Sequence, residues 1–190
     1  IIILLCFLFQ IEKTNKYQIV GLVISILGIL SIITRLNLEI IRSLNFNKGD
    51  LIMIGGVISW GLYSAFLKRK KFDLPLLTLV HILCTFGLIF IFPQFMYEFA
   101  QGQKIEINEN LFYILIFLAL FPSIGSYYCW AGAVSIIGAN RAGIFLSLIP
   151  LFSTLMAIFF YNEQFEFFHL IGAILIILGL FLSNKEIKNA

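Results

Sequence analysis

Residues 9–30, "FQIEKTNKYQIVGLVISILGIL", decide the fold because residues 160–181, "FYNEQFEFFHLIGAILIILGLF", match them without a gap at an offset of 151 residues. The matched pairs are Phe9 and Phe160, Glu12 and Glu163, Gly21 and Gly172, Ile26 and Ile177, Leu27 and Leu178, and Gly28 and Gly179. Aliphatic matches are frequent in so apolar a chain, but a glutamate and two glycines at fixed spacing are not. The pattern therefore predicts an internal repeat.

Composition places the chain in a membrane. It is 61% hydrophobic and 12% charged, with a mean hydropathy of +1.01, whereas soluble domains are about half apolar and about a quarter charged. Continuous apolar runs of about 17–25 residues recur, each long enough to cross a hydrocarbon core of roughly 30 Å. A β-barrel would instead show alternating polarity over segments of about ten residues. We predict an all-α, multi-pass membrane protein.

The apolar runs predict six complete spans. They cover residues 17–33, 50–66, 74–97, 111–137, 142–160 and 168–182. Residues 1–10 look like the end of a helix whose beginning is missing, without the features of a signal peptide. The linkers are short, which favours one membrane domain.

The distribution of Lys and Arg predicts the orientation. One side would carry Lys13, Lys16, Lys68, Arg69, Lys70, Lys71, Arg141, Lys185 and Lys188, and the other Arg35, Arg42, Lys48 and Lys104. The richer side is expected in the cytoplasm together with the C-terminus, in a bacterial inner membrane. The run Lys68–Lys71 is interpreted as a topology signal rather than a patch for nucleic acid or lipid.

An odd number of spans separates the two matched turns, so the Glu12 turn is cytoplasmic and the Glu163 turn external. Inverted repeats of this kind occur in secondary transporters, which hold substrate near the midplane. The offset predicts about 100 residues before Ile1 and a ten-helix, 5+5 protein of about 290 residues, of which the end of helix four and helices five to ten are present. The predicted parts are residues 1–33, the end of the first repeat; 34–49, a loop; 50–184, the second repeat; and 185–190, a cytoplasmic tail.

Two segments resemble a known family. They are "KGDLIMIGGVISWGLYSAFLKR", residues 48–69, and residues 125–183, from "GSYYCWAGAVS" to "IILGLFLS" by way of "NRAGIFLSLIPLFS". The second half, Gly49 to Ser183, resembles the EamA-type branch of the drug/metabolite transporter superfamily. Pro150, Glu163, Gly172 and Gly179 stand at positions of the family pattern.

The end of the first repeat, Ile1 to Leu30, resembles the same family through Glu12, Gly21 and Gly28. Where the family has Leu and Gly before the second glutamate, this chain has Tyr161 and Asn162. The resemblance implies a secondary transporter for an amino acid or related small metabolite, working by alternating access, and does not specify the substrate.

His81 is the only ionisable side chain well inside a predicted span, about 10 Å along its helix at about 1.5 Å per residue. It is a candidate for proton coupling or anion contact. The alternative is a neutral histidine hydrogen-bonded to a neighbouring helix. All Asp and Glu residues fall in loops or at helix ends, so no carboxylate relay is visible.

Aromatic side chains with polar tips are candidates to line a substrate cavity. They are Trp60 and Tyr63 in one span and Tyr127 and Tyr128 in another, with Ser147 as a polar neighbour. The alternative is an interfacial role, which is common for Trp and Tyr.

Pro122 and Pro150 each remove a backbone donor inside a span. Each is a candidate hinge or a fixed kink. The repeated glycines Gly21, Gly28, Gly172 and Gly179 are expected to permit close helix packing. Glu12 and Glu163 are expected to be structural, each stabilising the start of the helix that follows it.

No catalytic motif or paired-acid site occurs, so the chain is not predicted to be an enzyme. Cys6, Cys84 and Cys129 lie in apolar runs without metal or disulfide spacing. We expect no cofactor, no metal and no nucleic acid; lipid and a small-molecule substrate are the expected partners, with a homodimer left open. Alternatives are a non-transporting scaffold or half-transporter, or a membrane-embedded enzyme.

Overall fold

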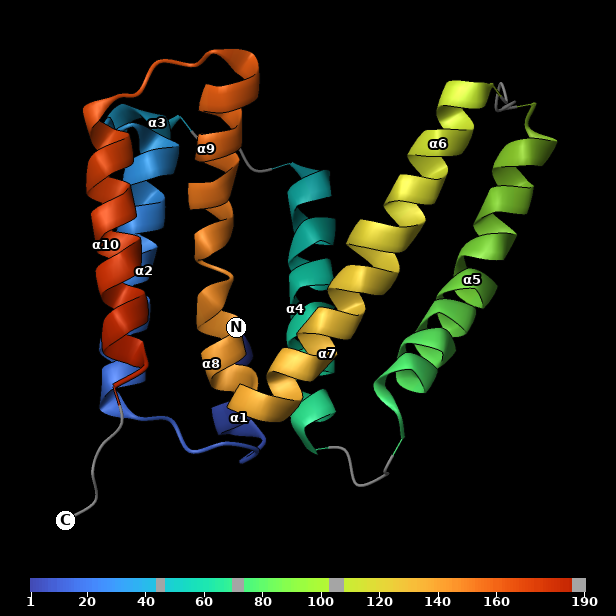
Figure 1. The fold of residues 1–190 in the computed structure, drawn as a ribbon, viewed down its shortest axis with the longest axis horizontal. Helices are drawn as coiled ribbons and strands as arrows, with labels where there is room; N and C mark the ends of the chain where they lie inside the picture. Colours follow the sequence, from blue (N-terminus) through green and yellow to red (C-terminus); the bar gives the residue numbers. More distant parts are fainter. Residues whose placement is uncertain (44–46, 70–73, 103–107, 186–190) are drawn as a thin grey trace. The chain divides into compact units, whose positions relative to one another are not determined.

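The computed structural model describes residues 1–43, 47–69, 74–102 and 108–185, which form helices and the connections between them (Figure 1). The chain divides into two compact units: unit 1 is Ile1–Arg69 with Val134–Ala190, and unit 2 is Lys70–Ala133.

Unit 1 contains α1 (Ile2–Leu8), α2 (Lys16–Thr34), α3 (Leu38–Arg42), α4 (Lys48–Arg69), α8 (Ala139–Phe145), α9 (Leu148–Tyr161) and α10 (Phe167–Ser183). Unit 2 contains α5 (Leu76–Ala100), α6 (Glu109–Leu118) and the π-helix η1 (Ala119–Gly125). Helix α7 (Ser126–Ile137) begins in unit 2 and ends in unit 1.

Among the described residues, five helical stretches are long and apolar enough to cross a membrane: Lys16–Thr34, Lys48–Arg69, Leu76–Ala100, Glu109–Ile137 and Ala139–Tyr161. Helix α10 is equally apolar but has 17 residues. The prediction of an all-helical, multi-span chain is confirmed. The short helix α3 is an addition, since it lies in residues 34–49, where a loop was expected. Asn37 begins it by accepting a hydrogen bond from the Glu39 amide at 2.9 Å.

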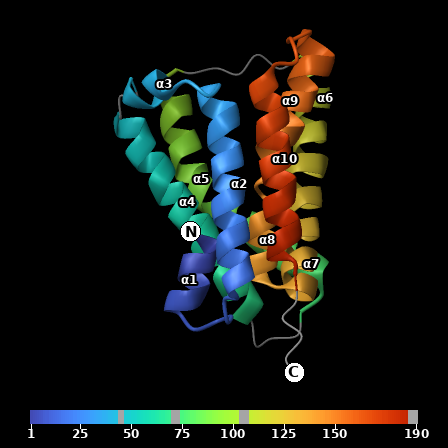
Figure 2. The same ribbon diagram turned by 90° about the vertical axis from the view of Figure 1, so that its left-hand side faces the viewer.

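Helices α2 and α10 lie side by side and run in opposite directions (Figures 1 and 2). Their backbones approach closely at four buried glycines. A Cβ atom added to Gly21 would meet the carbonyl oxygen of Gly179, and one added to Gly28 would lie 2.8 Å from the carbonyl oxygen of Gly172. The absence of side chains at these positions is therefore what brings the two helices together.

The contacts between α2 and α10 are reciprocal. A Cβ on Gly28 would lie 2.9 Å from Ile176, and one on Gly179 would meet Ser25. Gly179 and Ile176 follow Gly28 and Ser25 by 151 residues. The approach of Gly21 to Gly179 likewise corresponds to the approach of Gly172 to Gly28, because 151 residues separate Gly21 from Gly172 and Gly28 from Gly179. If each residue of α2 is replaced by its equivalent in α10, and the reverse, by a shift of 151 residues, these glycine contacts are obtained again.

The starts of α2 and α10 are built alike. The amide of Asn15 donates to Gln18 Oε1 at 3.0 Å, and the amide of Glu166 donates to His169 Nδ1 at 3.0 Å. Each is one half of a capping box, in which the side chain of the third helical residue accepts a hydrogen bond from the backbone amide of the residue before the helix. The two pairs again differ by 151 positions.

Asn162 follows the last residue of α9 as its C-cap, with a φ of 54°. Asparagine adopts this left-handed conformation more readily than most residues other than glycine. That preference accounts for Asn162 at a position where the resembled family has Gly.

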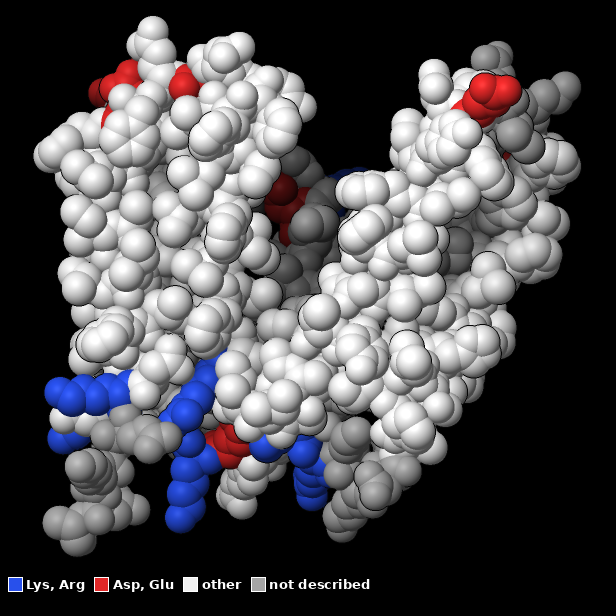
Figure 3. All heavy atoms as spheres, viewed as in Figure 1, with Lys and Arg blue, Asp and Glu red and all other residues white. Residues whose placement is uncertain are grey.

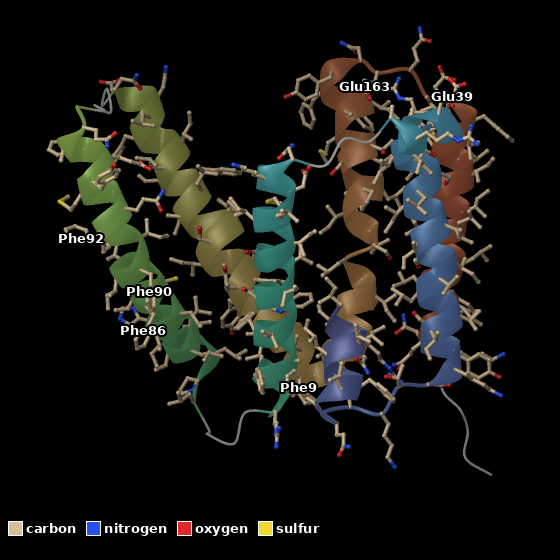
Figure 4. The ribbon with its side chains drawn as sticks, turned by 180° about the vertical axis from the view of Figure 1, so that it is seen from behind. Phe9, Glu39, Phe86, Phe90, Phe92 and Glu163 are labelled. Atoms are coloured by element: carbon tan, nitrogen blue, oxygen red, sulfur yellow. The ribbon has the colours of Figure 1, made fainter. Side chains whose placement is uncertain are left out.

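Lys and Arg side chains gather at one end of unit 1, the lower end in Figure 3. Of the charges used to predict the orientation, Lys70, Lys71, Lys104 and Lys188 lie outside the described residues. Figure 4 shows Phe9 and Glu163, each from one of the two matched turns, at opposite ends of this unit.

Enlarging a glycine at the α2–α10 contact should destabilise the protein. Gly28→Ala places a methyl group 2.8 Å from a backbone carbonyl oxygen that cannot rotate away, and overpacking of this kind costs about 1–3 kcal/mol. We expect a lower midpoint of thermal unfolding for the detergent-purified protein. Gly55→Ala is the matched control, because no described atom lies within 4 Å of its added Cβ. Equal midpoints for the two variants would contradict the role of the glycine contact.

Candidate functional site

The structure distributes the predicted cavity residues over both units. Trp60, Tyr63 and Ser147 belong to unit 1, and His81, Tyr127 and Tyr128 to unit 2. Within unit 1, the rings of Trp60 and Tyr63 are in contact, with centroids 5.3 Å apart and planes inclined by 49°.

A pocket in unit 1 is lined by Trp60. Its other lining residues are Ile1, Ile2, Ile3, Leu22, Val57, Gly143 and Leu146, and its volume is about 170 Å³. Apart from the indole N–H of Trp60, the lining side chains are apolar. Ligand pockets generally measure about 300–1,000 Å³ and include a few polar groups. This pocket can hold the apolar part of a small ligand, whose polar groups would need partners elsewhere.

Ser147 lies beside this pocket, at the break between α8 and α9. Because Pro150 has no N–H, it cannot donate to the carbonyl of Leu146; the amide of Ile149 does so instead, at 3.1 Å. The buried hydroxyl of Ser147 donates to the carbonyl of Ile144 at 2.7 Å. The carbonyls of Ile144 and Leu146 are therefore hydrogen-bonded within the break, as backbone groups at membrane depth require.

In unit 2, the break at Pro122 takes the form of the π-helix η1 rather than a gap. The hydroxyl of Ser126 donates to the carbonyl of Pro122. The side chains of His81 and Tyr128 are exposed in the described structure, and Tyr127 is half-buried. π-helical turns occur often at functional sites, and this one directly precedes the two tyrosines.

Glu12 makes a contact that the sequence did not predict. Its carboxylate accepts hydrogen bonds from the amide of Ala139, 3.0 Å from Oε1, and from the amide of Asn140, 2.9 Å from Oε2. These are the first amides of α8, where the helix leaves N–H groups without intrahelical partners and carries a partial positive charge. Glu12 was expected to stabilise α2, the helix that follows it, but the helix that it caps is α8.

Gly138 makes the Glu12 contact possible. Its φ is 89°, a conformation that favours glycine. A Cβ added here would lie 2.6 Å from Glu12 Oε1. The turn between α7 and α8 thus needs glycine for its backbone conformation and for the space that the carboxylate occupies.

Asn140 makes a second contact between the start of α8 and the turn that contains Glu12. Its side chain is buried, and its Nδ2 lies 3.5 Å from the hydroxyl of Thr14, a long contact. The turn Glu12–Thr14 therefore meets the start of α8 through one carboxylate and one hydroxyl. Charge-assisted bonds from backbone amides are the stronger part of this arrangement.

The comparisons agree with the helical membrane architecture. Residues 47–185 match the EamA-like transporter family. The chain belongs to this family.

Among curated proteins, the chain is similar to YyaM, an uncharacterized transporter of Bacillus subtilis, with 27% identity over 93% of this chain and 58% of the relative. An uncharacterized transporter of Archaeoglobus fulgidus is 26% identical over 92% of this chain and 60% of that protein. An uncharacterized vacuolar membrane protein of Saccharomyces cerevisiae is 21% identical over 93% of this chain and 49% of its own length. The EamA-type chain thus spans about half to three fifths of these relatives. No solved structure matches it.

One signal in the sequence could have pointed to the Glu12 contact. The turn "GANR", residues 138–141, combines a glycine with a helix start that has no acidic residue in its first turn. Glu12 is 127 residues away from Ala139, and spacing along the chain gave no reason to join them. The contact follows only from the packing of α1 against α8.

Replacing Gly138 should be more harmful than replacing another glycine of positive φ. Gly138→Ala and Gly102→Ala each place an alanine at a positive φ, 89° and 86° respectively, and sparsely populated backbone conformations of this kind cost about 1–3 kcal/mol. Only Gly138→Ala also displaces the Glu12 carboxylate, since no described atom lies within 4 Å of a Cβ on Gly102. Thermal unfolding should show the larger loss for Gly138→Ala; equal losses would refute the additional effect.

Removing the Glu12 carboxylate should loosen the start of α8. For Glu12→Ala we expect a loss of about 0.5–2 kcal/mol, the range for N-cap residues, and faster hydrogen exchange at Ala139 and Asn140. Hydrogen-exchange mass spectrometry of the peptide containing both residues measures this. Glu39→Ala is the control, because Glu39 lies in the first turn of α3 and its side chain is exposed. Unchanged exchange in Glu12→Ala would show that the two hydrogen bonds are dispensable.

Proposed function

We propose that this member of the EamA-like transporter family moves an amino acid or related small metabolite across the membrane by alternating access. In this mechanism two inverted five-helix halves rock against each other around a cavity near the midplane. The described chain supplies the end of the first half and most of the second.

The reciprocal contact of α2 with α10 is the observation that carries this proposal. Two helices related by an inverted repeat pack in opposite directions, and their contacts exchange when the repeats are exchanged. The glycine contacts have both properties at the offset of 151 residues. The α2–α10 pair is then the place where the two halves meet.

Within unit 1, the Trp60 pocket is the proposed place for the substrate. Its apolar walls suit the hydrocarbon part of an amino acid, and the neighbouring ring of Tyr63 brings a hydroxyl. We propose that His81, Tyr127, Tyr128 and Ser147 supply further polar contacts in the complete transporter. Pro122 and Pro150 are the proposed hinges, because the α-helical hydrogen-bonding pattern changes at or beside each of them.

The proposed orientation places the C-terminus in the cytoplasm of a bacterial cell. The end of unit 1 at which Lys and Arg gather (Figure 3) would face inward, since positive residues accumulate in cytoplasmic loops. Glu12 would then lie at the inner face and Glu163 at the outer face.

Uptake into proteoliposomes tests the proposal. The full-length protein should take up one or more labelled amino acids from a panel, and Trp60→Ala, Tyr63→Ala and His81→Ala should each reduce the flux without reducing membrane insertion. We expect losses of about tenfold or more where a bound polar or aromatic contact is removed, since tenfold corresponds to about 1.4 kcal/mol. Phe90→Ala is the control, because Phe90 is 78% exposed on α5 (Figure 4).

Wild-type flux in all three cavity variants would overturn the cavity assignment. Absence of flux for every compound, with intact insertion, would favour a non-transporting scaffold. Formation of a product without flux would favour a membrane-embedded enzyme.

A further inference from the structure

Glu12 and Glu163 occupy equivalent positions in the sequence repeat but differ in their surroundings. Glu12 holds two amides of α8. The side chain of Glu163 is exposed and makes no hydrogen bond or ion pair to the part of the chain that the structure describes. Figure 4 shows Glu163 at the end of unit 1 opposite to Phe9. The two repeats therefore differ in what their glutamates contact among the described residues.

We infer that Glu163 caps the N-terminus of a helix in the segment that precedes Ile1 in the full-length protein, as Glu12 caps α8. The inference rests on the two-repeat arrangement of the proposed function. It assigns Glu163 a specific partner: the first amides of the helix that corresponds to α8 and α9.

The expected position of that partner follows from the offset of 151 residues between the two repeats. Moving Ala139 back by 151 positions places the start of the corresponding helix about a dozen residues before Ile1. The same shift places the last residues of α9 on α1, so α1 is the end of the helix whose start Glu163 would hold. The curated relatives are long enough to contain such a segment, because the chain spans 58% and 60% of the length of two of them.

Two sets of contacts whose members are described follow the exchange. It reproduces the glycine contacts of α2 and α10, and it relates the Asn15–Gln18 bond to the Glu166–His169 bond. Both glutamate turns also contain a left-handed residue other than glycine, Gln10 with φ 53° and Asn162 with φ 54°. Gln10 stands two residues before its glutamate and Asn162 one, so the turns are similar in kind and differ by one residue.

The chemistry of the cap is independent of side chains on the partner. Backbone amides at a helix start are present whatever the sequence, and a carboxylate accepts from two of them at once. Each carboxylate would tie one half of the transporter to the other, Glu12 at one membrane face and Glu163 at the opposite face. The two halves would thus be fastened at both faces by the same bond.

Crosslinking in the full-length protein tests the inference. In a background without other cysteines, Glu163→Cys is combined with a cysteine at the upstream position that corresponds to Ala139, and a short bis-maleimide is added. A protease site in the connection between α2 and α3, which lies before Glu39, then reports whether the two fragments remain joined on a denaturing gel. We expect crosslinking at least tenfold above that of Glu39→Cys with the same upstream cysteine. Glu39 is the matched control, because it lies at the same end of unit 1 (Figure 4).

The pair Glu12→Cys and Ala139→Cys calibrates the yield, because the structure places these residues in contact. A Glu163 pair that stays at the level of the Glu39 control overturns the inference and leaves the two-repeat arrangement standing. A crosslink between two copies rather than within one also overturns it, in favour of a homodimer contact. An upstream segment without a helix start near that position would contradict the two-repeat arrangement itself.

A second measurement does not depend on thiol geometry. Glu163→Gln in the full-length protein should lower the midpoint of thermal unfolding by about as much as Glu12→Gln, on the order of 2–4 °C for a loss near 1 kcal/mol. Glu39→Gln should leave the midpoint unchanged. A midpoint for Glu163→Gln equal to that of Glu39→Gln would count against the cap even if the two positions crosslink.

Discussion

The close backbone approach of α2 and α10 is the constraint on which the rest of unit 1 depends. In lipid there is little hydrophobic force between helices, so association relies on van der Waals contact and hydrogen bonding. Glycines seven residues apart on each helix provide that contact. Because α8 and α9 also pack on this pair, the positions of the Trp60 pocket and of the Glu12 contact are set by it.

Much of the fold could be predicted from hydropathy alone. The runs from residue 17 to 33 and from 50 to 66 became α2 and α4, because a length of apolar residues that matches the bilayer is itself the physical requirement. The short helix α3 was missed, since five residues carry no periodic signal and only the Asn37 cap marks its start. The form of the break at Pro122, a π-helix, was likewise beyond what a proline signal specifies.

The site was less accessible to sequence reasoning. Trp60 was selected by residue type, and the structure places it on a pocket wall, yet nothing in the sequence indicated that Ile1–Ile3 would form the facing wall. The partner of Glu12 was missed because local rules assign a carboxylate to the nearest helix start, whereas tertiary packing brought a different one within hydrogen-bonding distance. A contact between single polar groups far apart in an apolar chain produces no periodic pattern in the sequence from which it could be predicted.

The π-helical turn Ala119–Gly125 has a consequence for how the span Glu109–Ile137 presents its surface. A π-turn holds one more residue than an α-turn, so every side chain beyond it is rotated by about 100° from the position that an unbroken α-helix would give it. The faces that α6 and α7 present are therefore out of phase with each other along the one span. A single helix of this kind can turn one face to lipid in its first half and a different face in its second, with no bend in the chain required.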